Sequence, residues 1–247
     1  MTHPDECRDS RDDARDDPVT DQTYDRTFNE LRTGFTAAVS HELRTPLARI
    51  LVLLDSAELP GADVRDLIDQ ARAEVENAGA LIDEILFLSE LESGREIVSL
   101  GHTTALPVLE DVVAEHEDAA ARAGVELAVT GDPRVDVPLR PRMLRMVAEN
   151  LVENAIRYSG PGSHFVFDVH RAGDFAVLTA SDDGVGVGEE ALPRLFERFY
   201  RADSARSSRG TGLGLAIVKH VVAAAGGDVE ADGARGRGLR VRATFPA

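Results

Sequence analysis

Residues 47–68, LARILVLLDSAELPGADVRDLI, show the pattern that decides the first half of the fold. Apolar residues recur at three- and four-residue spacing on both sides of Pro60 and Gly61, which interrupt the pattern. Followed outward, the first pattern begins at Thr23 and the second ends at about Glu92. The spacing therefore predicts two long amphipathic helices joined by a short turn, with the second helix folded back on the first.

This predicted hairpin has more apolar surface than it can bury by itself. Two helices of roughly 30 residues cannot cover both apolar stripes, and pairing with a second copy into a four-helix bundle is the simplest solution. We therefore expect a homodimer.

The texture of the chain changes after Gly94. Short apolar stretches with strand-like alternation lie at 96–100, 125–130, 164–170, 174–181, 227–231 and 238–245. Helical patterns fall near 105–123, 141–158 and 213–226. This mixture predicts a mostly antiparallel sheet packed against a layer of helices. The expected organisation is an acidic, disordered leader over 1–22, the helical domain over 23–93 and the sandwich domain over 94–247.

Composition excludes several classes of function. With 27 basic and 44 acidic residues, the chain has a net charge of −17, which repels nucleic acid. No apolar run approaches the roughly 18 residues that a membrane span requires, so we expect no membrane segment in this chain. The single cysteine, Cys7, excludes an internal disulfide framework. We expect a cytoplasmic location, whether as a separate protein or as the cytosolic part of a membrane sensor.

Residues 35–47, FTAAVSHELRTPL, place a histidine beside an acid and four residues before a hydroxyl. On a helix, His41 and Thr45 share one face and Glu42 lies next to them. A neutral imidazole is a good nucleophile near neutral pH, and an adjacent carboxylate can hold or accept the proton of its other nitrogen. Because His41 lies off the apolar stripe, we expect it to face solvent.

Residues 149–159, ENLVENAIRYS, carry a second polar cluster on a predicted helix. Asn150, Asn154 and Arg157 share one face at four- and three-residue spacing. Amide oxygens suit Mg²⁺, and a guanidinium one turn further along can meet phosphate oxygens. Taken alone, the same spacing is also typical of a solvated helix face.

The stretch 181–188, SDDGVGVG, follows an apolar strand. Asp182 at the strand end can accept a hydrogen bond from an adenine amine, and Gly184 and Gly186 would let the backbone approach a flat ligand. A tight glycine-rich turn is the structural alternative for this stretch.

A further glycine-rich stretch, GTGLGL at 210–215, opens a predicted helix. Backbone amides at a helix N-terminus bind anions, and Gly210, Gly212 and Gly214 would leave room for a phosphate chain. No GK[ST] follows, so this is not a Walker A loop. The arginine- and serine-rich residues 201–209 before it are predicted to form a flexible lid whose guanidinium groups reach phosphates.

Together these stretches closely resemble the sensor histidine kinases of bacterial two-component systems. FTAAVSHELRTPL is similar to the family's H-box, ENLVENAIRYS to its N-box, SDDGVGVG to its G1 box, LFERFYRAD at 195–203 to its F-box and GTGLGL to its G2 box. The five boxes stand in the family's order over about residues 24–245. The resemblance implies an α+β architecture: a HisKA helical hairpin forming a dimeric four-helix bundle, then a HATPase_c sandwich of the GHKL type that binds ATP.

The resemblance also implies residue roles. His41 matches the phosphoacceptor, Glu42 the assisting base, and Thr45 the residue that orients water when a partner regulator is dephosphorylated. Asn154 matches the Mg²⁺ ligand. The implied nucleotide-binding residues are Asn150, Asn154, Arg157, Tyr158, Asp182, Gly184, Gly186, Gly210, Thr211, Gly212, Leu213 and Gly214. The family more often has lysine at the position of Arg157, so the charge is kept while the geometry of its phosphate contact stays open.

The implied function is ATP-dependent phosphorylation of His41 followed by transfer of the phosphoryl group to an aspartate of a response regulator, with dephosphorylation of that regulator as a further activity. Helical spacing suggests Arg49, Val52, Leu53 and Ser56 as regulator contacts. Two alternatives remain: a phosphatase or docking scaffold, and a serine kinase or ATPase on the same ATP-binding fold. Whether His41 is phosphorylated within one protomer or across the dimer depends on the handedness of the turn at 59–62 and stays open.

Overall fold

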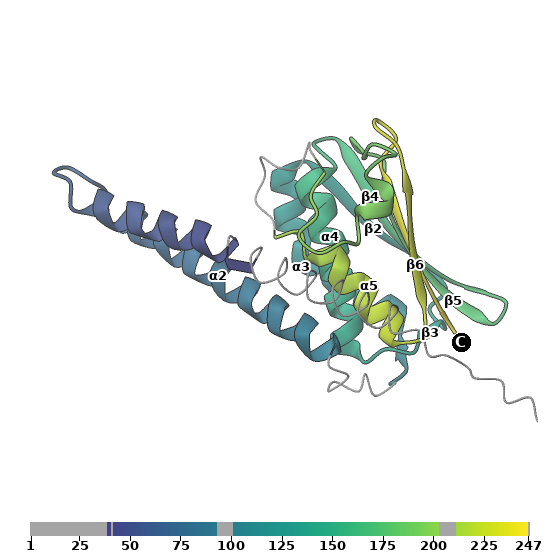
Figure 1. Ribbon diagram of the computed structural model, residues 1–247. Helices are drawn as coiled ribbons and strands as arrows, with labels where there is room; N and C mark the ends of the chain where they lie inside the picture. The colour runs from purple at the N-terminus through teal and green to yellow at the C-terminus, as the bar shows by residue number, and fades with distance from the viewer. Residues whose placement is uncertain (1–38, 41, 93–100, 203–210, 247) are drawn as a thin grey trace, which may run out of the picture. The chain divides into compact units, whose positions relative to one another are not determined.

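The computed structural model describes residues 39–40, 42–92, 101–202 and 211–246 (Figure 1). The chain divides into two compact units, residues 1–41 and residues 42–247. Of the first unit the structure describes Val39 and Ser40, which are helical. The expected leader over 1–22 and the expected strand over 96–100 lie outside the described residues.

The second unit begins with a helical hairpin. Residues 42–57 are helical, and a turn leads into α2, Val64–Glu92. Gly61 lies in this turn with a φ of 84°, and the Ala62 amide donates to the Leu59 carbonyl over 3.2 Å. Asp63 caps the second helix, because its Oδ1 accepts the backbone N–H of Asp66 at 3.2 Å. The break predicted at Pro60 and Gly61 is therefore where the chain turns.

Few of the large apolar side chains of the hairpin are buried. Leu81 and Leu88 are buried, at 3% and 0% exposed. Other large apolar side chains are exposed to solvent, although their spacing is that of the buried face of an amphipathic helix. These exposed residues are Leu47, Leu51, Val52, Leu54, Leu59, Val64, Ile68, Val75, Ile82 and Leu86. A single copy of the hairpin thus leaves an extended apolar surface uncovered.

An ion pair joins the two helices of the hairpin. Arg49 Nη1 lies 3.3 Å from Glu74 Oε1, and the Glu74 side chain is only 7% exposed. A carboxylate this deeply placed needs a cationic or hydrogen-bonding partner to offset the loss of hydration. Arg49, which helical spacing suggested as a regulator contact, therefore also has a role inside the hairpin.

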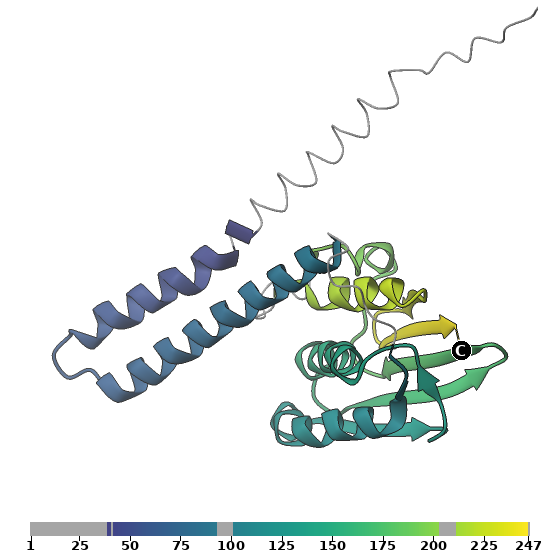
Figure 2. The same ribbon diagram turned by 90° about the horizontal axis from the view of Figure 1, so that it is seen from below.

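The rest of the described chain forms two layers, with three helices on one face of a sheet (Figures 1 and 2). The sheet has the order β2-β4-β5-β7-β6; β2 pairs with β4 in parallel, and the other neighbours are antiparallel. The strands are β2 Val125–Gly131, β4 Ser163–Ala172, β5 Phe175–Asp182, β6 Asp228–Gly233 and β7 Leu239–Pro246. The helices are α3 Ala105–Ala123, α4 Pro141–Tyr158 and α5 Gly214–Ala224.

The core lies between these layers. Alternate side chains of the central strands point at the helices, among them Phe167, Leu178 and Phe245, each at most 1% exposed. From the helical side, α4 contributes Leu144 and Val147, both fully buried. Because α4 lies between α3 and α5, its buried stripe is pinned on three sides and its polar face is held in a fixed orientation.

The elements agree closely with those expected from periodicity. The structure adds a small antiparallel pair, β1 (Thr103–Thr104) with β3 (Asp136–Val137), which sequence reasoning missed. Strands of two residues carry no period that could reveal them. Within the described ranges, no helix combines the length and the apolar character that crossing a membrane demands.

Candidate nucleotide-binding site

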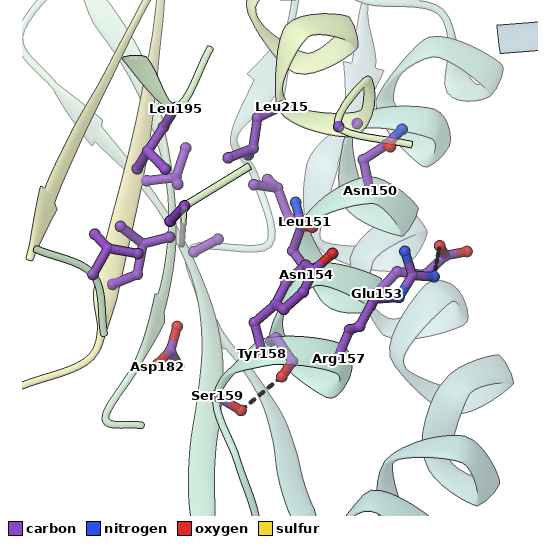
Figure 3. A pocket seen from close by; sticks show the side chains of 18 of the residues that line it. Asn150, Leu151, Glu153, Asn154, Arg157, Tyr158, Ser159, Asp182, Leu195 and Leu215 are labelled. Atoms are coloured by element: carbon purple, nitrogen blue, oxygen red, sulfur yellow. Dashed lines mark hydrogen bonds and ion pairs between the residues drawn. The ribbon is translucent and has the colours of Figure 1, made fainter. Parts of the chain in front are cut away.

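A cavity of about 250 Å³ opens between α4 and the sheet (Figure 3). The polar face of α4, the end of β5 and the turn before α5 all contribute to its walls. The lining includes Asn150, Asn154, Arg157, Tyr158, Asp182, Gly186, Thr211, Gly212 and Gly214. Residues from three separate sequence motifs, up to 64 positions apart between Asn150 and Gly214, thus meet at one place.

The α4 wall presents the two asparagines and the arginine predicted to share one face (Figure 3). Asn150 is fixed by its own helix, because its Nδ2 donates to the Met146 carbonyl over 2.8 Å. Its Oδ1 is turned toward the start of α5, where a Cβ built on Gly214 would lie 2.5 Å from it. No side chain larger than hydrogen fits at Gly214 without moving Asn150.

Arg157 lies at the same wall, beside Glu153. Its Nη2 is 3.5 Å from Glu153 Oε2, one helical turn away (Figure 3). Both side chains are partly exposed, at 39% and 53%, so the pair is weak and the guanidinium can exchange this carboxylate for another anion.

Asp182 stands at the end of β5, with the α4 residues across the cavity (Figure 3). Its Oδ1 accepts the backbone N–H of Gly184 at 2.9 Å, which orients the carboxylate. Burial raises the pKa of Asp182, and the hydrogen bonds from the Gly184 and Leu239 amides oppose that rise. The surrounding wall is apolar and includes Phe165, Ala180, Val187, Leu195, Leu215, Leu239 and Val241. An apolar slot with one oriented acceptor suits a flat heterocycle that carries an amino group.

Gly184 and Gly186 are in close contact with protein backbone. A Cβ on Gly184 would lie 2.2 Å from the Ser159 carbonyl oxygen, and one on Gly186 would lie 2.0 Å from the Ala234 carbonyl oxygen. Gly186 also has a φ of 62°, which L side chains rarely adopt. These glycines seat the turn after β5 against the end of α4 and the β6–β7 connection, and Gly186 also lines the cavity.

The turn before α5 is held by the segment that follows the 3-10 helix Leu192–Arg194. The Phe199 amide donates to the Gly212 carbonyl at 2.9 Å, and Phe199 has the unusual φ of 59°. On the other side, the Leu213 amide donates to Thr211 Oγ1 at 3.2 Å. The sequence stretches matching the F-box and the G2 box therefore support each other's backbone.

Of the predicted site residues that the structure describes, four do not line this cavity: Glu42, Thr45, Gly184 and Leu213. His41 and Gly210 lie outside the described residues. Glu42 and Thr45 lie on the helical stretch 42–57, where Glu42 is half-buried and Thr45 is exposed. Leu213 is fully buried beneath the turn, so its side chain anchors the start of α5.

Glu84 of α2 also lines the cavity, and sequence reasoning missed it. Its Oε2 accepts a hydrogen bond from Thr211 Oγ1 at 3.0 Å. Burial raises the pKa of Glu84; the Thr211 hydrogen bond and Arg157 oppose that rise, while Glu153 adds to it. The two bonded residues are 127 positions apart in the sequence, so no local pattern could have indicated the contact.

The donor set limits how a metal ion could be held. Within the described ranges, no three His, Cys, Asp or Glu side chains gather as a metal cluster. Besides the separate carboxylates of Glu84, Glu153 and Asp182, the cavity offers the amide side chains of Asn150 and Asn154. Such neutral oxygen ligands suit Mg²⁺ that keeps waters and is shared with phosphates, rather than a metal caged by protein alone.

Family models and relatives agree with this combination of hairpin and cavity. Residues 31–94 match the His Kinase A (phospho-acceptor) domain, and residues 140–247 match the histidine kinase-, DNA gyrase B- and HSP90-like ATPase domain. The sensor-like histidine kinase SenX3 of Mycobacterium bovis is 33% identical over 222 residues, covering 87% of this chain and 54% of SenX3. The chain therefore spans about half the length of that relative.

Solved structures show the same architecture. The mycobacterial sensor histidine kinase MprB is 30% identical with a TM-score of 0.53, covering 59% of this chain and 97% of that one. The Acinetobacter baumannii histidine kinase AdeS has a TM-score of 0.69 at 24% identity, covering 83% of this chain and 97% of that one. The fold and the two family matches define an ATPase-type sandwich joined to a hairpin of the His Kinase A type. The chain belongs to the two-component sensor histidine kinases.

Proposed function

We propose that this chain uses ATP to phosphorylate His41 and then passes the phosphoryl group to an aspartate of a response regulator. The observation that carries the proposal is the cavity itself, in which an oriented carboxylate and an apolar slot lie opposite two asparagines and a helix N-terminus. These are the groups that a purine and a phosphate chain require.

The residues divide between the two ends of the nucleotide. Asp182 accepts a hydrogen bond from the adenine amine. A purine with a carbonyl oxygen at that ring position could not donate this hydrogen bond. The start of α5 and Arg157 face the phosphates with positive electrostatic potential. Asn154 would hold Mg²⁺, which would neutralise charge on the phosphates.

In the transfer step, a nitrogen of His41 forms a bond to the γ-phosphorus while the bond from that phosphorus to the bridging oxygen breaks. ADP leaves, and Glu42 holds the proton on the other nitrogen of the imidazole. An aspartate carboxylate of the regulator later displaces the imidazole from phosphorus. Thr45, which is exposed on the helical stretch 42–57, would orient the water that hydrolyses the phosphoaspartate of the regulator and releases inorganic phosphate.

The assembly that we propose is a homodimer of hairpins. The support is the apolar surface that a single hairpin leaves uncovered, with Leu47, Leu51 and Val75 each more than half exposed. We keep the domain division of 23–93 for the hairpin and 94–247 for the sandwich. Arg49, Val52, Leu53 and Ser56 remain our proposed regulator contacts, and because ATP is a cytoplasmic substrate we place the chain there.

The test is labelling with γ-³²P-ATP and Mg²⁺, using the wild-type chain and two variants. His41→Gln removes the proposed phosphoacceptor, and His102→Gln, an exposed histidine after the hairpin, is the matched control. We expect acid-labile, base-stable label on the wild type and on His102→Gln, and none on His41→Gln.

Other outcomes point elsewhere. Label on His41→Gln at the wild-type level would show that another residue accepts the phosphoryl group, and acid-stable label would indicate serine chemistry. Nucleotide binding without label, together with regulator dephosphorylation, would favour a phosphatase.

A further inference from the structure

Glu84 brings a carboxylate from the phosphoacceptor hairpin into the nucleotide cavity. Its Oε2 accepts a hydrogen bond from Thr211 Oγ1, 3.0 Å away. Glu84 lines the cavity together with Arg157 and Gly214. Each of these neighbours belongs to the part of the cavity that faces phosphates in the proposed function.

The surroundings of Glu84 are those of a bound anion. Thr211 stands three residues before Gly214, the first residue of α5, where the helix dipole favours negative charge. Arg157 contributes a favourable electrostatic interaction with Glu84. The Thr211 hydroxyl, the Arg157 guanidinium and the N-terminus of α5 thus surround the carboxylate that α2 brings to the cavity. A phosphate at the same place would be stabilised by the same three groups.

A nucleotide phosphate chain and the Glu84 carboxylate compete for these partners. Both are anionic, and placing like charges side by side in a partly buried site is strongly unfavourable. Glu153, which also lines the cavity, adds to the negative charge near Glu84. The polyphosphate can therefore bind fully only if the Glu84 carboxylate leaves Thr211.

Resting on the proposed function, we propose that Glu84 is an autoinhibitory residue that occupies the phosphate end of the ATP cavity and holds Thr211 until the hairpin withdraws it. The hairpin thereby regulates nucleotide affinity, separately from the role of His41 as phosphoacceptor. A movement of α2 relative to α5 would then change the affinity for ATP directly.

The experiment measures binding of the non-hydrolysable analogue AMPPNP with Mg²⁺, and of adenosine, by calorimetry on the full chain. The variants are Glu84→Gln, which removes the charge, and Glu84→Ala, which removes the contact as well. Glu76→Gln is the matched control, because Glu76 is an exposed acid on the same helix and the substitution changes the net charge equally.

We expect Glu84→Gln to tighten AMPPNP binding about tenfold, equivalent to ~1.4 kcal/mol, and Glu84→Ala to tighten it at least as much. Adenosine, which has no phosphates, should bind all variants alike, and Glu76→Gln should match the wild type. Unchanged or weaker AMPPNP binding by both Glu84 variants would overturn the inference while leaving the proposed function standing. If neither the wild type nor any variant binds AMPPNP, the proposed function itself fails and the inference with it.

Discussion

Gly214 lies so close to Asn150 that a Cβ on the glycine would stand 2.5 Å from Asn150 Oδ1. The asparagine cannot easily yield, because its Nδ2 is bonded to the Met146 carbonyl. We therefore expect Gly214→Ala to displace the Asn150 amide and to weaken AMPPNP binding about tenfold, ~1.4 kcal/mol. Calorimetry measures the loss, and wild-type affinity in this variant would contradict the coupling of Gly214 to binding through Asn150.

A matched control exists in α2. Gly79 lies inside that helix, and a Cβ there would meet no atom within 4 Å. Since glycine costs a helix interior about 0.5–1 kcal/mol relative to alanine, Gly79→Ala should raise stability by that amount and leave AMPPNP affinity unchanged.

Asp182 and Asp183 are neighbours whose pKa values shift in opposite directions. Burial raises the pKa of Asp182 above its ordinary 3.8. Between the ordinary pKa and the raised pKa, the folded protein therefore binds this proton more firmly than the unfolded chain does. Stability contributed by this group therefore falls as pH rises through the folded pKa. We expect Asp182→Asn to melt at a higher temperature than the wild type at pH 7.5, with the gap closing as the pH falls toward 4.

Asp183→Asn should behave in the opposite way. The His164 amide and imidazole, at 2.6 and 2.9 Å, hold the pKa of Asp183 below its ordinary value. Its contribution to stability is present above that ordinary value and is lost as pH falls through the folded pKa. Melting curves from about pH 2.5 to 8 measure both variants. A shift of the same sign in the two near neutral pH would contradict these assignments.

The Arg49–Glu74 pair predicts an asymmetry between its two halves. Arg49→Met keeps an apolar stem but leaves the buried Glu74 carboxylate without this cation, whereas Glu74→Gln removes the charge itself. We expect Arg49→Met to destabilise the hairpin by about 1 kcal/mol, discounted because Arg49 is half exposed, and by more than Glu74→Gln does. Urea unfolding of the two variants and of their combination measures the coupling, and additive losses would show that the pair contributes nothing.

The apolar surface of the hairpin predicts how dimerisation can be broken. Leu51 is 62% exposed in the single chain, and we expect Leu51→Glu to shift the sedimenting species toward monomer because a charge cannot be buried unpaired in a helical bundle. Phe175→Glu is the control, because Phe175 is 48% exposed at the start of β5, outside the hairpin. A Leu51→Glu chain that stays dimeric would place the dimer contact elsewhere.

Periodicity predicted most elements because it is a local property. The helices expected near 105–123 and 141–158 match α3 and α4, and the strand expected at 164–170 lies within β4. Each helix can pack on the sheet only if its sequence has apolar residues at helical spacing, and that spacing is visible in the sequence. By contrast, the parallel pairing of β2 with β4 needs a crossover connection, which α4 supplies, and no pattern within a single segment reveals that pairing.

The motifs also predicted several of the polar residues that line the cavity. Asn150, Asn154, Arg157 and Asp182 all do so. The spacing on one helix face is enough to bring the first three together, because that face is fixed once the opposite face is buried.

The sequence by itself determined the hairpin, the layered domain and several of the polar residues at the cavity, because these depend on periods and motifs within single segments. Only the tertiary structure decided that Gly184 and Gly186 seat backbone against backbone, and that Glu84 enters the cavity to meet Thr211. Such contacts join positions far apart in the chain. The distance between the two contacting residues depends on how whole helices and strands pack, and it cannot be inferred from the sequence of either segment alone.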